Sequence, residues 1–322
     1  MNGTAYLDTF ANDNLPPREQ WPELLFELPE LVYPERINCA VELLDAMVAR
    51  GHGGSIAIRG AGVNWTYDAL RETVDRIAGV LRGEMKLVPG NRVLLRGANN
   101  PMMAACVLAV WKAGCVAVPT MPLLRAKELA TIMTLARVDA VLCAADLRAE
   151  LDLACDGLDA APRVVSFNDS APGSLDQMMA AMPPRFEAVA TWAEDVCLLS
   201  FTSGTTGRPK GTMHFHRDVL AICDCFPRSV LATTPADVFI GTPPLAFTFG
   251  LGGLLLFPLR HGASTVLLEK LNPDSLLAAI AEYRATVCFT APTFYRQMAP
   301  LAARHDLSSL TRSVSAGEAL PL

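Results

Sequence analysis

A run of hydroxyl side chains and glycines at residues 200–211 has the composition of a phosphate-binding loop. It reads Ser-Phe-Thr-Ser-Gly-Thr-Thr-Gly-Arg-Pro-Lys-Gly and continues an apolar, strand-like stretch. Glycine lets backbone N–H groups converge on phosphate oxygens, hydroxyl groups donate further hydrogen bonds, and lysine adds a positive charge. The residues expected to supply these groups to a triphosphate are Thr202, Ser203, Gly204, Thr205, Thr206, Gly207 and Lys210.

This run differs from the Walker A loop, in which the lysine follows a glycine and opens a helix. Here Pro209 precedes Lys210, and Pro209 together with Gly211 opposes a helix at that point. Residues 211–214 are typical of a strand, so the sequence predicts a loop between two strands. An ordinary surface turn rich in serine, threonine and glycine is the alternative, and a run this long argues against it.

Composition excludes several classes of protein. The chain has 322 residues, of which 51% are hydrophobic, and a net charge of -6, so it can bury a large core and offers no basic surface for nucleic acid. The N-terminus lacks the pattern of a secretory signal, and the longest apolar stretches, 102–111 and 251–259, are too short to span a bilayer. We expect a soluble, cytoplasmic protein without nucleic-acid or membrane partners.

The nine cysteines and two nearby histidines carry no evident site pattern. No CxxC pair occurs, and only Cys223 and Cys225 lie close together in sequence, which argues against a zinc site and a disulfide framework. We therefore expect reduced thiols that mostly fill core volume, and no metal site. His214 and His216 follow the loop, and we interpret them as neutral core or helix-entry histidines in preference to catalytic ones.

Strand-like and helix-like segments alternate as in a mostly parallel α/β fold. Helices are predicted at 38–50, 67–81, 101–113, 127–136, 217–226 and 274–283, and strands at 56–59, 92–96, 116–119, 140–143, 196–202, 211–214, 238–242, 265–268, 287–290 and 312–315. Two start signals support the helix assignments, Thr66 as an N-cap and Pro101 as a first helical residue. The chain then divides into an N-terminal arm (1–35), a first α/β subdomain (36–155), a connection (156–194) and a second α/β subdomain with the loop (195–322).

The loop and several further motifs resemble the adenylate-forming superfamily, which includes acyl- and aryl-CoA synthetases, nonribosomal adenylation domains and luciferases. The similarity extends over essentially the whole chain in ordered motifs. Besides the loop, these are Thr66-Tyr-Asp-Ala-Leu70, Ala109-Val-Trp-Lys-Ala-Gly114 with Val118-Pro-Thr-Met-Pro122, Pro243-Pro-Leu-Ala-Phe-Thr-Phe-Gly-Leu-Gly252, and Ser315-Ala-Gly-Glu-Ala-Leu-Pro321.

The resemblance implies a fold, a reaction and roles for particular residues. The fold is the superfamily's N-terminal domain, with stacked, mostly parallel sheets flanked by helices. In the reaction, a carboxylate attacks the α-phosphorus of ATP, pyrophosphate leaves, and a thiol captures the acyl-adenylate. The loop residues would hold the β- and γ-phosphates, with Mg²⁺ carried mainly by the phosphates. The backbone of Gly317, Glu318 and Ala319 would contact adenine, and the acyl pocket would include Phe247, Thr248, Phe249, Gly250 and Thr293. In that pocket, Gly250, Gly252 and Gly253 would let a flat substrate approach the backbone.

The residues of these motifs are most similar to those of benzoate-type ligases, and the run WPELLFELPE is similar to aminobenzoate ligases. We therefore expect an aromatic acid, with 2-aminobenzoate as the specific choice and coenzyme A as the thiol. The alternatives are an adenylation domain that loads a carrier protein, a medium- or long-chain fatty acyl-CoA ligase, and a non-catalytic nucleotide-binding protein. A homodimer is an assembly that the sequence leaves open.

The resemblance also sets an expectation about what residues 1–322 lack. The superfamily's later Tyr-Gly-x-Thr-Glu motif, ribose-binding aspartate and catalytic lysine have no counterpart in this range. We expect a chain truncated before its β-barrel subdomain is complete and without the C-terminal lid domain. Its catalytic set would then be incomplete, and it would form acyl-adenylate slowly or not at all.

Overall fold

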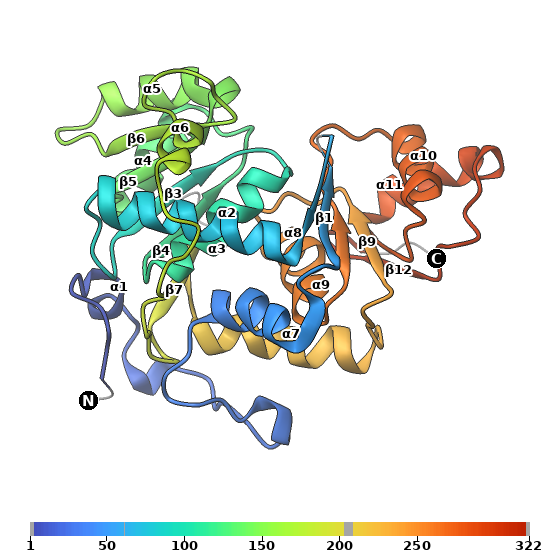
Figure 1. Ribbon diagram of the computed structural model, residues 1–322, viewed down its shortest axis with the longest axis horizontal. Helices are drawn as coiled ribbons and strands as arrows, with labels where there is room; N and C mark the ends of the chain where they lie inside the picture. Colours follow the sequence, from blue (N-terminus) through green and yellow to red (C-terminus); the bar gives the residue numbers. More distant parts are fainter. Residues whose placement is uncertain (1–2, 61, 203–208, 320–322) are drawn as a thin grey trace.

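The computed structural model describes residues 3–60, 62–202 and 209–319, which form two six-stranded sheets with helices on their faces (Figure 1). The first sheet contains, in spatial order, β6 (Arg163–Phe167), β5 (Ala140–Ala144), β3 (Arg92–Arg96), β4 (Val116–Thr120), β7 (Val196–Thr202) and β8 (Lys210–Phe215). The second contains β12 (Arg312–Ser315), β11 (Val287–Thr290), β9 (Val238–Gly241), β10 (Ser264–Val266), β1 (Ile56–Gly60) and β2 (Val63–Thr66).

Strand pairing is parallel in both sheets except for one hairpin in each. β7 pairs antiparallel with β8, and β1 pairs antiparallel with β2. The helices are α1 (Phe10–Asp13), α2 (Tyr67–Gly79), α3 (Pro101–Lys112), α4 (Ala126–Ala136), α5 (Arg148–Asp156), α6 (Leu175–Ala180), α7 (His216–Ser229), α8 (Thr248–Leu251), α9 (Phe257–Arg260), α10 (Pro273–Tyr283) and α11 (Pro292–Met298). The predicted α/β class with stacked, mostly parallel sheets is confirmed.

Three apolar layers alternate with the two sheets because strand side chains point alternately to opposite faces. In β3, Val93 and Leu95 enter the central layer, whereas Leu94 enters the layer on the outer face with α4 and α5. In the second sheet, Phe239 and Phe289 face the central layer, while neighbouring residues of β9 and β11 face α10 and α11. The central layer, with α2, α3, α8 and α9, therefore joins the two sheets into one body (Figure 1).

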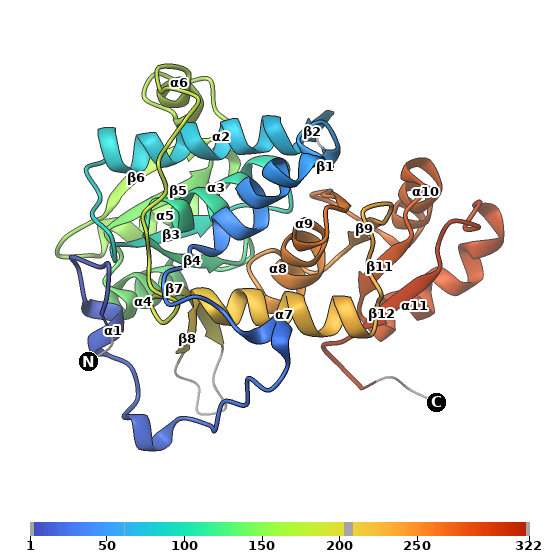
Figure 2. The same ribbon diagram turned by 60° about the horizontal axis from the view of Figure 1, so that its bottom comes forward.

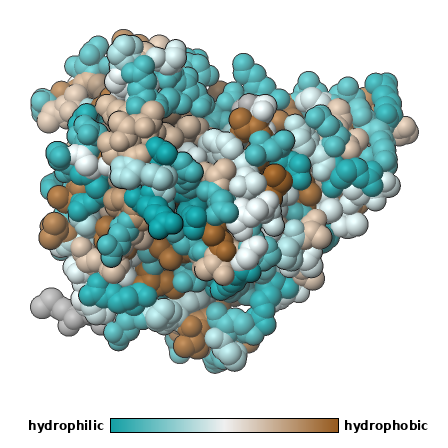
Figure 3. Space-filling model, in the orientation of Figure 1, coloured by the Kyte–Doolittle hydropathy of each residue, from teal (hydrophilic) through white to brown (hydrophobic). Residues whose placement is uncertain are grey.

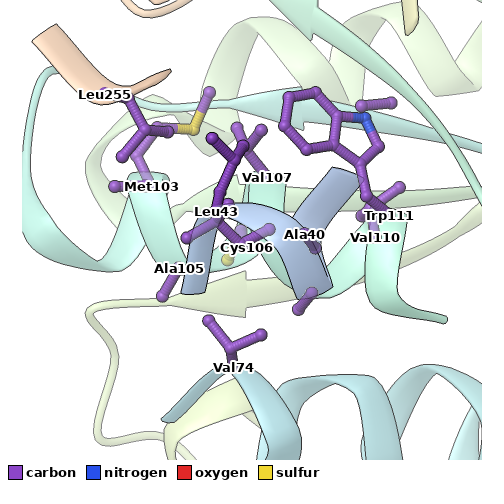
Figure 4. Packing of buried hydrophobic residues seen from close by; sticks show 14 of the residues in the cluster. Ala40, Leu43, Val74, Met103, Ala105, Cys106, Val107, Val110, Trp111 and Leu255 are labelled. Atoms are coloured by element: carbon purple, nitrogen blue, oxygen red, sulfur yellow. The ribbon is translucent and has the colours of Figure 1, made fainter. Parts of the chain in front are cut away.

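Helix α3 is the most deeply buried helix of this central layer. Its N-cap Asn100 accepts a hydrogen bond from the Met103 N–H at 2.8 Å, and Pro101 occupies the first turn as predicted. Figure 4 shows Met103, Val107 and Trp111 packed among side chains from neighbouring elements. The Trp111 indole N–H also donates to the Cys197 carbonyl of β7 at 2.8 Å, so α3 contacts the strand that leads into the loop.

The sheets do not follow the predicted division of the chain. Strands β1 and β2 lie before residue 155 but belong to the second sheet, and β7 and β8 lie after residue 195 but belong to the first. The predicted connection, 156–194, contains β6 and α6, and β6 extends the first sheet. Strand partners are chosen across long sequence separations, which local patterns do not report. How the chain divides into folding units stays a prediction.

The face in Figure 3 is mainly hydrophilic, with separate hydrophobic patches. Within the described ranges, no helix is long and apolar enough to cross a bilayer.

Candidate functional site

The predicted phosphate loop is framed by the ends of two antiparallel strands. Thr202 at the end of β7 is the register partner of Lys210 at the start of β8, which confirms the predicted strands on both sides of the run. Both residues are exposed, and Lys210 makes no ion pair with any described residue. The predicted residues Ser203, Gly204, Thr205, Thr206 and Gly207 lie outside the described residues.

The hairpin that carries this loop is held by contacts across its two strands. The Thr212 hydroxyl donates to the Ser200 carbonyl at 3.0 Å. Gly211 lies opposite Phe201, and a Cβ at Gly211 would be 3.1 Å from the Phe201 ring, so glycine leaves room for that ring. These contacts fix the directions from which Thr202 and Lys210 leave the sheet.

Of the two histidines after the loop, His214 is half-buried and His216 is buried. Burial lowers the pKa of His214, whose Nε2 lies 3.3 Å from the Thr212 hydroxyl. His216 is fully buried and begins α7, where its Nδ1 accepts a hydrogen bond from the Cys39 N–H at 3.2 Å. The interpretation of His214 and His216 as core or helix-entry histidines agrees with these positions.

The candidate acyl-pocket residues lie where the chain leaves β9 and enters α8. Phe247 and Thr248 are exposed, while Phe249 packs against Phe289 of β11 with ring centroids 5.5 Å apart. A Cβ at Gly250 would lie 2.1 Å from the Pro244 carbonyl oxygen, so this glycine makes room for the protein's own backbone. The expected reason for Gly250, close approach of a flat substrate, has no support in this geometry, and its role in binding the acid stays a prediction.

The two following glycines of this motif also serve internal packing. A Cβ at Gly253 would lie 2.4 Å from the Phe289 ring, and one at Gly252 would lie 3.1 Å from the Phe257 ring. Side chains of the central layer fill the space beside these two glycines, so the expectation that Gly252 and Gly253 let a substrate approach the backbone has no support in this geometry and stays a prediction.

The adenine and acyl candidates are brought together by one carboxylate. Glu318, after β12, accepts hydrogen bonds from the Thr293 N–H at 2.9 Å and from the Thr293 hydroxyl at 2.5 Å. These hydrogen bonds hold the pKa of the exposed Glu318 carboxyl below its usual range. These two hydrogen bonds hold Glu318, and with it the neighbouring Gly317 and Ala319, beside the start of α11. The sequence placed these residues in two separate groups and carried no signal for their pairing.

Asn99 is a further residue of this region that sequence reasoning missed. Its side chain donates to the Pro243 carbonyl at 2.9 Å and accepts from the Leu245 N–H at 2.8 Å, so it clamps the segment before Phe247. A cavity of about 180 Å³ lies beside this clamp, lined by residues that include Asn99, Thr242 and Pro244. In the sequence, only the adjacent Asn99 and Asn100, shortly after β3, could have drawn attention to this position.

Among the candidate residues that the structure describes, all except Lys210 lie at or beyond the carboxyl ends of strands. Thr202 ends β7, Phe247 follows β9, Thr293 follows β11 and Glu318 follows β12. In open α/β sheets this edge is where ligands bind. Figure 2 shows β8 and the segment after β12 at the lower side of the molecule, with α7 running between them. The phosphate candidates thus lie on the first sheet and the acid and adenine candidates on the second.

Comparison with known proteins points to one family. A family model described as AMP-binding enzyme matches residues 46–322. A benzoate–CoA ligase of Thauera aromatica is 30% identical over 91% of this chain and 56% of its own length. An anthranilate–CoA ligase of Pseudomonas aeruginosa is 33% identical over 73% of this chain and 45% of its own length.

Solved structures agree with this result. The crystal structure of the anthranilate CoA ligase AuaEII in complex with anthranoyl-AMP superposes with a TM-score of 0.86 at 27% identity, covering 91% of this chain and 57% of that chain. The chain therefore spans about half the length of the relatives it matches.

Proposed function

Because the chain belongs to the AMP-binding enzyme family, we propose that it provides the ATP- and acid-binding part of a ligase that activates an aromatic carboxylic acid. The acid's carboxylate attacks the α-phosphorus of ATP, pyrophosphate leaves, and the resulting acyl-AMP reacts with the thiol of coenzyme A. The observation that carries this proposal is the hairpin end, where Thr202 and Lys210 face each other on either side of a serine-, threonine- and glycine-rich segment.

The hairpin end has the donor chemistry that the outer phosphates of ATP require. Lys210 is exposed and without an ion-pair partner among the described residues, so its ammonium group is available to an anion. The Thr202 hydroxyl lies on the opposite strand in register. Donors fixed in place before pyrophosphate leaves stabilise its developing charge by several kcal/mol. Mg²⁺ would be bound mainly through phosphate oxygens.

An aromatic acid is supported by the rings beside the candidate pocket and by the relatives. Phe249 packs on Phe289, and Phe247 is 42% exposed, so an aromatic edge is available beside α8. Thr293 adds a hydroxyl at the start of α11. The relatives' names specify benzoate and anthranilate, which is 2-aminobenzoate. We propose 2-aminobenzoate as the acid and coenzyme A as the thiol, because both relatives are named as CoA ligases.

Adenine is proposed to contact the backbone of Gly317, Glu318 and Ala319. The two hydrogen bonds from Thr293 to the Glu318 carboxylate support this role, because they hold that backbone against α11. A cytoplasmic location and a homodimeric assembly stay predictions.

A thermal-shift series tests the choice of acid. The chain is heated with ATP and Mg²⁺ and with benzoate, 2-aminobenzoate or octanoate at equal concentration. A ligand that binds only the folded state raises the melting temperature, and at equal concentration the ligand with the lower Kd raises it more. The proposal predicts the largest shift for 2-aminobenzoate, a smaller one for benzoate and none for octanoate. A larger shift with octanoate would favour a fatty acyl ligase.

A pyrophosphate-exchange assay tests the expectation that residues 1–322 alone turn over slowly or not at all. Isotope exchange between pyrophosphate and ATP requires reversible formation of acyl-AMP. We expect exchange near the background rate with 2-aminobenzoate. Exchange at the rate of a chain that also carries the superfamily's lid domain would show that the lysine of that domain is dispensable for adenylation.

A further inference from the structure

Three side chains of metal-binding type meet in the interior at the start of α7. Cys39 lies just before the helical stretch Val41–Asp45, Cys197 lies on β7, and His216 is the first residue of α7. All three are completely buried. Their ligand atoms, two sulfurs and one imidazole nitrogen, lie within 4.8 Å of one another. The three residues are widely separated in sequence, so the fold alone creates this group.

Hydrogen bonding leaves part of this group unpartnered. The His216 Nδ1 lies 3.1 Å from the Cys39 sulfur and accepts from the Cys39 N–H, while the Cys197 thiol donates to the His214 carbonyl at 3.5 Å. The Nε2 atom of His216 is buried and has no hydrogen-bond partner within the described ranges. Because Nδ1 is the ring nitrogen beside the Cys39 sulfur, Nδ1 and not Nε2 is the atom that would bind an ion, in place of its hydrogen bond from the Cys39 N–H.

We propose that Cys39, Cys197 and His216 bind one thiophilic metal ion with a filled d shell, Zn²⁺ or Cu⁺. Zinc–sulfur and zinc–nitrogen bonds of about 2.3 and 2.0–2.1 Å place ligand atoms at separations that this group spans with small side-chain shifts. Binding releases both thiol protons and leaves two thiolates and a neutral imidazole on the ion.

Charge and coordination number favour different ions of this class. Two thiolates neutralise Zn²⁺, which suits a buried site, whereas Cu⁺ leaves a net negative charge. Structural zinc, however, almost always takes four ligands, and the group contains only three ligand residues within the described ranges. Both ions are soft enough for thiolate ligands, so the experiment separates them. This inference does not rest on the proposed ligase function.

Metal binding would cross-link three parts of the chain. These are the segment after the N-terminal arm, strand β7, which ends at Thr202, and helix α7. The cross-link would stabilise the packing at the base of the hairpin.

Metal content and affinity of the whole chain test the proposal. Because the ligands are buried, the chain is unfolded with a chelator, refolded without oxygen in the presence of Zn²⁺ or Cu⁺, desalted and analysed by elemental mass spectrometry. We expect one ion per chain, and competition with a chelator should show at least ~100-fold weaker binding for Cys39→Ser and Cys197→Ser. Cys106→Ser, a buried cysteine of α3 outside the group, is the matched control and should bind like the unmodified chain.

X-ray absorption of the unmodified, metal-loaded chain covers the case in which a variant does not fold. A first coordination shell with two sulfurs and an imidazole nitrogen supports the site, for whichever ion is retained. Retention of neither ion would overturn the proposal, as would Cys39→Ser and Cys197→Ser binding equal to that of Cys106→Ser, or a shell without two sulfurs.

Discussion

Replacement of Lys112 by methionine should destabilise the central layer more than any exposed charge change. The Lys112 ammonium lies 2.7 Å from Asp45 and 2.5 Å from Asp75, and its side chain is only 1% exposed. Methionine keeps most of the side-chain volume but removes the cation, which leaves the Asp75 carboxylate buried without a counter-charge. Breaking a buried ion pair in this way costs about 3–5 kcal/mol. Asp45 is less buried and can turn toward solvent.

The pH dependence of this loss follows from Asp75. Burial raises its pKa in the folded chain, and loss of Lys112 raises that pKa further. A carboxyl whose folded pKa lies above the unfolded value favours the folded state below the unfolded pKa, and this contribution is lost as pH rises through the folded pKa. The deficit of Lys112→Met should therefore shrink as the pH is lowered toward the unfolded pKa of Asp75.

Urea denaturation followed by tryptophan fluorescence measures these effects. Lys112→Met should lower the free energy of unfolding by about 3–5 kcal/mol at neutral pH, and Lys112→Met with Asp75→Asn should recover much of it. Arg71→Ala, which removes an exposed pair with Asp68, is the control and should cost less than about 1 kcal/mol. A Lys112→Met loss no larger than that of Arg71→Ala would refute the reasoning.

Three further changes probe the site. Lys210→Ala should weaken ATP·Mg²⁺ binding about tenfold or more, because one charge-assisted contact of about 1.5–3 kcal/mol is lost, as measured by calorimetry. Because the pKa of Glu318 is lowered in the folded chain, its hydrogen bonds with Thr293 are fully present above the unfolded pKa of Glu318 and are lost as the pH falls through its folded pKa. Protection of the Thr293 amide from hydrogen exchange should therefore increase with rising pH in the unmodified chain. It should not do so in Glu318→Gln. Gly253→Ala should lower stability by about 1–3 kcal/mol because its Cβ would meet a phenyl ring, whereas Gly83→Ala, in open space, should not.

Local sequence signals predicted local structure well. The N-cap at Thr66 is confirmed by its hydrogen bond from the Ala69 N–H at 3.1 Å, and Pro101 opens α3. The prediction of a strand, not a helix, at Lys210 is confirmed, because Pro209 and Gly211 both disfavour a helix at that point. These features depend on residues a few positions apart, which is the range that sequence patterns report.

Contacts between distant segments were not predictable in the same way. No local pattern indicated that β1 and β7 would each join the sheet of the other half. The hydrogen bonds of Glu318 with Thr293, and the meeting of Cys39 with His216, likewise depend on how whole elements pack. The glycines of the Phe247 motif were assigned to substrate approach because the sequence does not show which neighbour fills the space beside them.

A crystal structure of the chain with ATP and Mg²⁺ tests the central claim most directly. The account predicts that the β- and γ-phosphates lie beside the Thr202 hydroxyl and the Lys210 ammonium, with the adenine ring next to Gly317. Nucleotide bound elsewhere, with Lys210 directed away from it, would contradict the assignment of this hairpin as the ATP site.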